Sequence, residues 1–344
     1  MDTAMSKHRA ARITRHSTCP RVVAAAKLCA ADVVRQPETR RVRYQPDRRR
    51  ILTFWATSSA VGLALLVTVS CGQSSGSGDN STSTGPSSEI TSASLPLRGI
   101  IVLGHSALTG ENSDPHSPGV PALQNSWATG ANPTVDSIYQ RLAAVDPTLR
   151  GHTFNAAAGG GTAAALVGQA TKALRIVPNP RLVIIEIIGT DIRCDGSARN
   201  NYPVFGQQVK AVLDLIAKKA PHTTILLMSQ PGRPLQVSKA ILGTAGVRAW
   251  SGSDICSPFD PNLRLDMKHI TTLTGIIEGY ESELTKVCAT VPECNTDNGR
   301  ATHFQVRASY YNYSNYDWHH FNVTGLAALA KFMWPTVAKI LNLH

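Results

Sequence analysis

The chain has 344 residues, of which 42% are hydrophobic and 17% are charged, the composition of a soluble globular protein with one large or two small domains. Its formal net charge of +11 would indicate a nucleic-acid partner if it were spread over the fold. Residues 1–50, however, hold 13 Lys and Arg against four Asp and Glu, a net charge of +9, which leaves only +2 for the rest. This distribution argues against nucleic-acid binding by the folded part.

The N-terminal quarter of the chain has the pattern of an export signal behind a basic leader. Residues 1–50 show no apolar periodicity, and we expect them to be disordered or to precede the true translation start. Residues 51–70 form a run of twenty residues without a charge, directly after three arginines. A basic flank followed by an apolar run is typical of a signal peptide. We therefore predict that the rest of the chain is exported.

The end of the apolar run predicts how the chain is held at the membrane. Ser70, Cys71 and Gly72 resemble the lipobox of bacterial lipoproteins, in which the cysteine is lipid-modified and becomes the mature N-terminus. The alternative is an uncleaved anchor at 51–71, because twenty apolar residues can span a bilayer. Both alternatives predict an extracytoplasmic protein, because the arginines stay on the cytoplasmic side. Residues 72–96 are rich in Ser, Gly and Thr and are predicted to form a flexible tether.

From residue 97 to 344, short apolar runs alternate with longer amphipathic stretches. This alternation is typical of βαβ units around a parallel sheet, so we predict one α/β domain built as a three-layer α/β/α sandwich with about five strands. The predicted strands are 99–103, 152–155, 182–188, 223–229 and 303–308. The predicted helices are 134–145, 162–176, 204–219, 262–287 and 323–341.

The stretch 100–110, IIVLGHSALTG, carries the first candidate for chemistry. Four apolar residues before Gly104 indicate a buried parallel strand, and Ser106 follows two residues later. In open α/β sheets the ligand site lies just beyond the carboxyl ends of the strands. Ser106 is therefore expected in the active-site crevice, although an ordinary Gly/Ser turn would have the same local pattern.

A second block, YDWHHFNVTG at 316–325, supplies what a serine nucleophile requires. A serine needs an adjacent base, and that base needs a third group to orient it. Asp317 and His320 are three residues apart, so a single turn can bring the carboxylate to the imidazole. His319 is the alternative base.

At this point the sequence resembles the GDSL/SGNH hydrolase family. The resemblance rests on four ordered blocks: GHSALTG, NAAAGGGT, IEIIGTD and DWHHFN. It implies a flavodoxin-like α/β/α fold and a cofactor-free serine esterase or lipase. Ser106 would be the nucleophile, His320 the general base and Asp317 the orienting acid. The oxyanion hole would be formed by the amides of Ser106 and Gly160 and by a side chain of the third block.

Two residues depart from the family pattern. Thr190 stands where the family has Asn in the oxyanion hole, and its shorter hydroxyl is expected to weaken that hole. His105 stands where the family usually has Asp, before the nucleophile. We consider His105, Asn125 and Trp127 as further candidates for the substrate pocket.

Four cysteines lie in the predicted domain: Cys194, Cys256, Cys288 and Cys294. An even number in an exported domain indicates two disulfides, for which three pairings exist. We favour Cys288–Cys294 around a short loop, with Cys194–Cys256 joining two loops near the site. A zinc site is the alternative, but no Cys-x-x-Cys or Cys/His ligand spacing occurs, so we expect no metal.

The sequence as a whole predicts an exported, lipid-anchored serine hydrolase that acts as a monomer on carboxylic esters, either lipid acyl esters or carbohydrate O-acetyl esters. The alternative is a weak or inactive domain of the same type that binds an envelope glycan or lipid. Thr190 keeps that alternative open.

Overall fold

The computed structural model describes residues 98–311 and 317–343. The chain divides into two units, and every described residue belongs to the second, Pro86–His344. The predictions for the leader, the apolar run, Cys71 and the tether therefore lie outside the described residues. Among the residues that are described, no helix is both long enough and apolar enough to cross a membrane.

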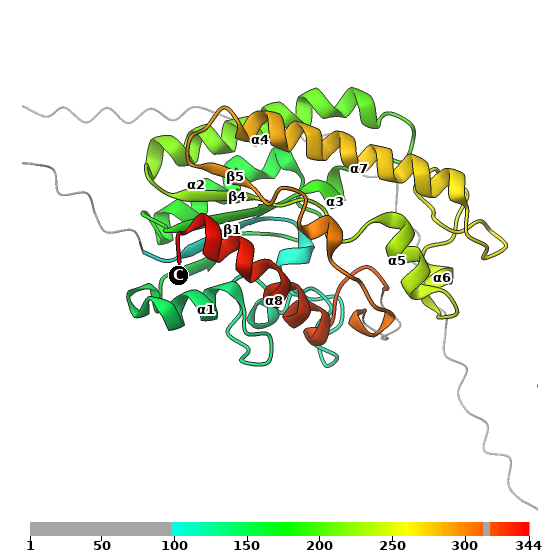
Figure 1. Cartoon of the computed structure of the whole chain (residues 1–344), viewed down its shortest axis with the longest axis horizontal. Coiled ribbons are helices and arrows are strands. Elements are labelled where there is room, and N and C mark those ends of the chain that lie inside the picture. Colours follow the sequence, from blue (N-terminus) through cyan, green and yellow to red (C-terminus); the bar gives the residue numbers. More distant parts are fainter. Residues whose placement is uncertain (1–97, 312–316, 344) are drawn as a thin grey trace, which may run out of the picture. The chain divides into compact units, whose positions relative to one another are not determined.

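The second unit is built on one five-stranded sheet, all of whose strands are parallel (Figure 1). The strand order is β2-β1-β3-β4-β5, the flavodoxin-like order of doubly wound folds. In this order the chain reverses its direction of winding between β1 and β3, and a crevice forms there at the carboxyl ends. The bounds are β1 Ile100–Gly104, β2 Thr153–Asn155, β3 Leu182–Glu186, β4 Thr224–Leu227 and β5 Cys294–Thr296.

Alternate residues of the central strands pack into two separate hydrophobic cores. Ile100 and Val102 of β1 belong to one core, and Ile101 and Leu103 belong to the other. Successive side chains of a strand point to opposite faces, so a strand covered on both faces reads as a continuous apolar run. This explains why β1, β3 and β4 were recognisable from the sequence.

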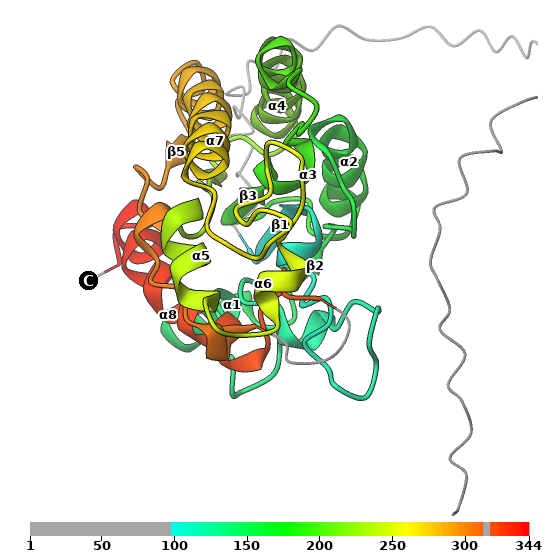
Figure 2. The ribbon, with the colours of Figure 1, turned by 90° about the vertical axis from the view of Figure 1, so that its right-hand side faces the viewer.

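The helices cover both faces of the sheet, which gives the predicted α/β/α fold (Figures 1 and 2). Helices α2, α4 and α7 pack on one face, and α1 and α8 pack on the other. Figure 2 shows α5 and α6 in front of the sheet, between these two groups. The bounds are α1 Ile138–Val145, α2 Leu166–Ile176, α3 Ile188–Asp191, α4 Ala198–Lys219, α5 Pro234–Ile241, α6 Gly246–Ala249, α7 Met267–Cys288 and α8 Val323–Ile340.

Side-chain caps fix where three of these helices begin. Ser137 and Gln140 form a capping box at the start of α1, and Asp266 accepts from two backbone N–H groups at the start of α7. Asn322 caps α8 by accepting from the Gly325 N–H. Helices α1 and α7 consequently begin four and five residues later than the apolar pattern alone predicted.

The predicted fifth strand at 303–308 was wrong. Phe304 and Val306 are buried and Gln305 and Arg307 are exposed, so the period of two is real. The segment nevertheless lies between two short 3-10 helices, Ala301–His303 and Ala308–Tyr310, and its alternation reflects packing against the core. The fifth strand is β5, three residues that pair with β4.

Both favoured disulfides are present. Cys288–Cys294 joins the end of α7 to β5, and Cys194–Cys256 joins the loop after α3 to the loop after α6. Asp254 lies close to Cys194 and Cys256, but these sulfurs are bonded to each other and offer no thiolate to a metal.

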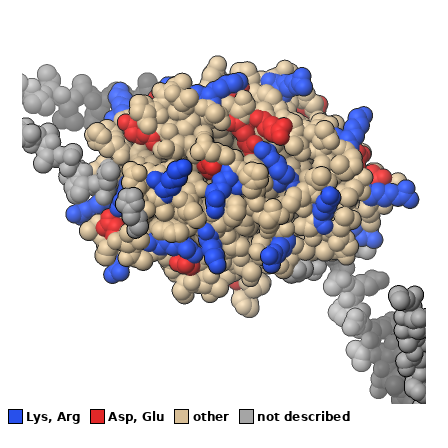
Figure 3. All heavy atoms as spheres, viewed as in Figure 1, with Lys and Arg blue, Asp and Glu red and all other residues tan. Residues whose placement is uncertain are grey.

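The charged side chains of the folded unit are mixed in sign. On the face shown in Figure 3, Lys and Arg are scattered with Asp and Glu between them, and they form no continuous basic stripe.

Candidate active site

Ser106 lies just beyond the carboxyl end of β1, as the first residue of a 3-10 helix, Ser106–Leu108. The sharp exit from the strand depends on Gly104, whose φ of +142° favours glycine. A Cβ there would also lie 1.8 Å from the carbonyl oxygen of Glu186. The backbone can therefore turn closely over β3, which brings Ser106 to the crevice between β1 and β3.

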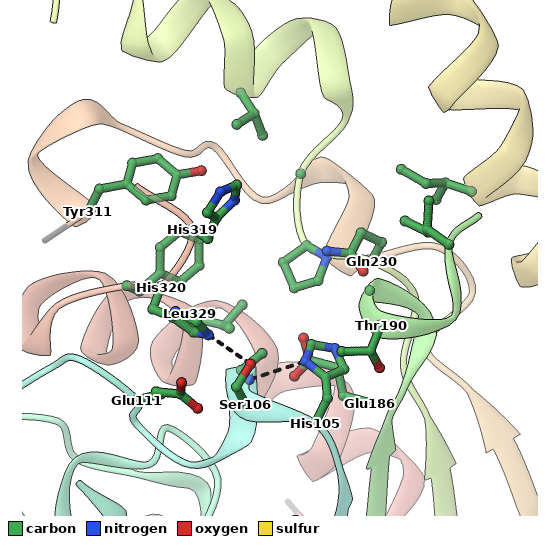
Figure 4. Close-up of a pocket in the computed structure, with 18 of the residues that line it drawn as sticks. His105, Ser106, Glu111, Glu186, Thr190, Gln230, Tyr311, His319, His320 and Leu329 are labelled. Atoms are coloured by element: carbon green, nitrogen blue, oxygen red, sulfur yellow. Dashed lines mark hydrogen bonds between the residues drawn. The ribbon is translucent and has the colours of Figure 1, made fainter. Parts of the chain in front are cut away.

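The side chains of Ser106, His320 and Asp317 form a chain of two hydrogen bonds. Nε2 of His320 lies 2.7 Å from Oγ of Ser106, and Nδ1 of His320 lies 2.9 Å from Oδ2 of Asp317 (Figure 4). Since the carboxylate accepts at Nδ1, the neutral imidazole carries its proton there and presents a lone pair to the serine hydroxyl. The residue in contact with Ser106 is His320 and not His319.

Asp317 is held as an anion by several donors. Its Oδ1 accepts from the backbone N–H groups of His319 (3.1 Å) and His320 (3.0 Å), and its Oδ2 accepts from the side-chain amide of Asn112. Partial burial opposes ionisation, but the hydrogen bonds and the nearby His320 outweigh it and lower the pKa of Asp317. Asn112 was missed from the sequence, because its link to Asp317 spans 205 residues and depends on how its loop folds.

Asn322 ties the His320 segment to the rest of the fold. Besides capping α8, its side-chain amide donates to the carbonyl oxygens of Ser309 and Tyr311, both at 2.9 Å. Tyr311 also forms an antiparallel bridge with Phe321. Phe321, the residue after His320, is thus held by its bridge to Tyr311 and by the hydrogen bonds of Asn322. This limits the positions that the imidazole of His320 can reach.

A cavity of about 330 Å³ opens beside the serine and the histidine. One wall is apolar and includes Val237, Leu273, Ile277 and Leu329. Four residues around the cavity have buried side-chain atoms without a hydrogen-bond partner within the described part of the chain: His105 (Nε2), Glu111 (Oε2), Gln230 (Oε1) and Glu186 (both carboxyl oxygens). A ligand in this cavity would meet a hydrophobic surface and several free polar groups.

The predicted oxyanion residues are only partly brought together. Thr190 lines the cavity, but its hydroxyl donates to the carbonyl oxygen of Gly161. Gly160 is exposed at the tip of its turn with φ +69°, and it does not line the cavity. That turn contacts the end of β1, because Ala158 N donates to Gly104 O at 3.2 Å. Within the described residues, the backbone N–H groups of Ser106 and Gly160 donate to no acceptor.

The three further pocket candidates differ in their positions. His105 lines the cavity, next to Ser106. Trp127 is fully buried in the core between β1 and α1, so its prediction as a pocket residue was wrong. Asn125 is also buried and away from the cavity, where it donates to Ser113 (2.9 Å) and accepts from Asn132 (2.7 Å). Its side chain holds the loop together and does not meet the site.

His319 belongs to the cavity wall. Its ring packs on Trp250 with the ring centroids 4.7 Å apart. Burial lowers the pKa of His319, although the neighbouring Asp317 raises it in part. A neutral, stacked His319 forms surface for a substrate and points away from the proton path between Ser106 and Asp317 (Figure 4).

No protein-family model matches the sequence, and no curated protein matches it. Similar solved structures include lipases and carbohydrate esterases. An extracellular lipase from Streptomyces rimosus is 16% identical over 71% of this chain and 99% of its own, with a TM-score of 0.44. Phospholipase A1 from Streptomyces albidoflavus NA297 is 13% identical over 71% and 99%, with a TM-score of 0.45.

A family two carbohydrate esterase from Cellvibrio japonicus is 14% identical over 72% of this chain and 63% of its own, with a TM-score of 0.38. All three TM-scores lie below 0.5.

Proposed function

We propose that this chain is a serine hydrolase of the GDSL/SGNH type that cleaves carboxylic esters. The observation that carries the proposal is the continuous path from the Ser106 hydroxyl through His320 to the ionised Asp317, with hydrogen bonds of 2.7 Å and 2.9 Å. This constellation is the one that activates a serine for attack on an acyl carbon. It opens on a cavity large enough for a small ester.

The first half of the reaction transfers the acyl group to the enzyme. Oγ of Ser106 attacks the carbonyl carbon while its proton moves to Nε2 of His320, and the carbonyl electron pair moves to the oxygen. The imidazolium formed is stabilised by Asp317, whose lowered pKa keeps it anionic. When the tetrahedral intermediate collapses, the C–O bond to the alcohol breaks and His320 returns the proton to the leaving oxygen.

The second half repeats these steps with water. Water takes the place of the alcohol, gives a proton to His320 and attacks the acyl-enzyme. The Ser106–acyl bond then breaks, the serine recovers its proton, and the acid leaves. No step requires a group other than the residues named and water, so the proposal includes no cofactor.

The substrates that we propose are esters of the cell envelope, either lipid acyl esters or acetylated glycans. The apolar wall of the cavity suits an acyl chain, and the unpartnered polar atoms suit hydroxyl groups of an alcohol moiety. The envelope address rests on the export signal at 51–71 and on the lipobox-like Cys71.

The test of the activity compares wild type with Ser106→Ala. Wild type should react with a fluorophosphonate probe and hydrolyse p-nitrophenyl acetate and longer acyl esters. Ser106→Ala should not be labelled, and its kcat should be lower than that of wild type by a factor of about 10³ or more. Ser309→Ala removes an exposed serine from the segment that precedes Asp317 and serves as the matched control.

A folded wild-type chain that neither labels nor hydrolyses any ester of the series would contradict the proposal. The alternative, a catalytically inactive domain that binds an envelope glycan or lipid, would then explain the cavity. The hydroxyl of Thr190, which is occupied by Gly161, is the observation that favours this alternative.

A further inference from the structure

The imidazole of His105 has its tautomer fixed by the backbone. Its Nδ1 accepts from the N–H of Ala107 at 3.2 Å, so the proton of the neutral ring is on Nε2. Burial, and to a smaller extent the nearby His320, lower the pKa of His105 to about 4. At neutral pH the ring is therefore uncharged and has one N–H to donate.

That N–H has no acceptor in the described part of the chain. His105 is only 6% exposed, and its Nε2 is buried without a hydrogen-bond partner while the residue lines the cavity. A buried donor left unpaired destabilises the folded state. Such a cost at the edge of an active-site cavity indicates a donor kept free for a ligand.

Gly189 keeps the space beside this donor open. A Cβ at position 189 would lie 3.1 Å from Nε2 of His105 and 3.2 Å from its Cε1. The position is in helix α3 and does not have a positive φ, so the backbone itself does not require glycine there. With glycine there, position 189 places no side chain against the N–H, and both residues line the cavity.

His105 and His320 lie on opposite sides of Ser106. Figure 4 shows His320 on one side of the serine, bonded to its Oγ, and His105 on the other, toward Thr190. In acyl transfer, the base lies on the side of the attacking and leaving oxygens, and the oxyanion forms away from it. The free N–H of His105 thus lies on the side where negative charge develops.

We propose that His105 donates from Nε2 to the oxyanion of the tetrahedral intermediate and so supplies the side-chain donor that Thr190 does not. The inference rests on the proposed ester hydrolase function. When Oγ of Ser106 bonds to the carbonyl carbon, the π pair moves to the carbonyl oxygen and the His105 N–H hydrogen-bonds to it. Its proton stays on Nε2 throughout, and the bond is released when the C=O bond reforms.

The first test replaces His105 by Leu, which removes the donor, and by Gln, which retains an N–H on a side chain of similar length. With p-nitrophenyl acetate and the full chain, His105→Leu should lower kcat by about 10²–10³-fold with little change in KM. His105→Gln should recover part of that loss. Equal activity of wild type and His105→Leu would overturn the proposal.

The second test asks whether the lost interaction is with the carbonyl oxygen itself. Sulfur is a weaker hydrogen-bond acceptor than oxygen, so an ester in which C=S replaces C=O uses an oxyanion donor poorly. The ratio of kcat/KM for p-nitrophenyl acetate to that for its thiono analogue should fall about tenfold or more in His105→Leu. An unchanged ratio would mean that His105 only positions Ser106, which also contradicts the proposal.

A third variant protects the test against misfolding of the His105 variants. Gly189→Ala places a methyl group beside Nε2 at a helical position, where alanine favours the helix. It should keep thermal stability and lower kcat about tenfold or more. Retained kcat in a stable Gly189→Ala would count against the proposal.

The outcomes separate this inference from the proposed function. If wild type labels and hydrolyses esters but the three variants match it, the serine esterase stands and the role of His105 falls. If wild type itself shows no Ser106-dependent labelling, the proposed function fails first.

Discussion

The carboxyl group of Glu186 lies at the end of β3, beside the cavity, with neither oxygen hydrogen-bonded within the described residues. Burial raises its pKa to about 8; the nearby Trp127 indole offsets part of that rise, and the charge of Asp297 adds to it. At neutral pH most of the folded molecules therefore carry a neutral Glu186. Nothing in the sequence signals this protonation state, because the strand pattern marks position 186 only as buried.

This raised pKa predicts how stability depends on pH. The folded chain keeps a proton that the unfolded chain loses above a pH of about 4.3, so stability falls as pH rises from there to about 8. Glu186→Gln cannot ionise and should escape this loss. The free energy of unfolding of Glu186→Gln, relative to that of wild type, should therefore increase by ~2–5 kcal/mol between pH values of about 4.3 and about 8.

Chemical denaturation at a series of pH values measures that difference. Glu278→Gln, which alters an exposed carboxyl on α7, is the control for a surface change. A Glu186→Gln difference that is the same at pH 4.5 and pH 8 would show that Glu186 is ionised in the folded protein.

Among individual residues, the sequence predicted those that meet at Ser106 but not those that support them. Asp317 and His320 are neighbours in sequence, so their contact follows from local spacing. Asn112 reaches Asp317 through a loop whose course is set by packing. The hydroxyl of Thr190 was expected at the cavity, but its bond to Gly161 depends on how close two turns approach each other.

The two disulfides close loops of very different length, and this predicts unequal contributions to stability. Cys194–Cys256 spans 62 residues, and Cys288–Cys294 spans six. A longer closed loop removes more entropy from the unfolded chain, so replacing the first pair by serine should cost about 4 kcal/mol and replacing the second about 2 kcal/mol.

Thermal and denaturant unfolding of the two double-serine variants, each against wild type, measures these costs. The Cys194–Cys256 bridge also holds the loop that follows α3, and Thr190 lies in α3, just before that loop. Its loss should therefore lower kcat as well, whereas loss of Cys288–Cys294 should leave kcat close to wild type. Equal destabilisation by both variants would contradict the loop-length argument.

The helices and strands that could be predicted are those whose burial requires a regular pattern of apolar residues. Strands β1, β3 and β4 are apolar runs because both of their faces are covered. β5 has three half-buried residues and no apolar run, and its position is set by pairing with β4 and by the bridge at Cys294. The segment 303–308 shows the reverse case, in which an alternating pattern arises from packing without any strand partner.

For the whole molecule, the fold class followed from the order of its elements, whereas the proposed export rests on residues before the domain. The nearly neutral domain and the strongly basic 1–50 segment differ sharply in charge. Such a difference fits a folded unit that leaves the cytoplasm behind a basic flank.

The two modes of membrane attachment give different results when Cys71 is replaced. In bacteria that process lipoproteins, the wild-type full chain should enter the membrane fraction and incorporate labelled palmitate. Cys71→Ala should lose the label and leave the membrane if the cysteine carries the anchor. Cys29→Ala, which changes a leader cysteine, is the control. Membrane association that survives in unlabelled Cys71→Ala would favour the uncleaved anchor instead.

The proposed reaction unites two segments from opposite ends of the domain, since Ser106 and His320 are 214 residues apart. His320 stands just before α8, the last helix described, which packs into the core beside α1 through Leu329, Met333 and Val337. A growing chain therefore carries its nucleophile long before it carries the base. If the proposed function holds, the chain would be inactive throughout its synthesis and would become active only once α8 has docked.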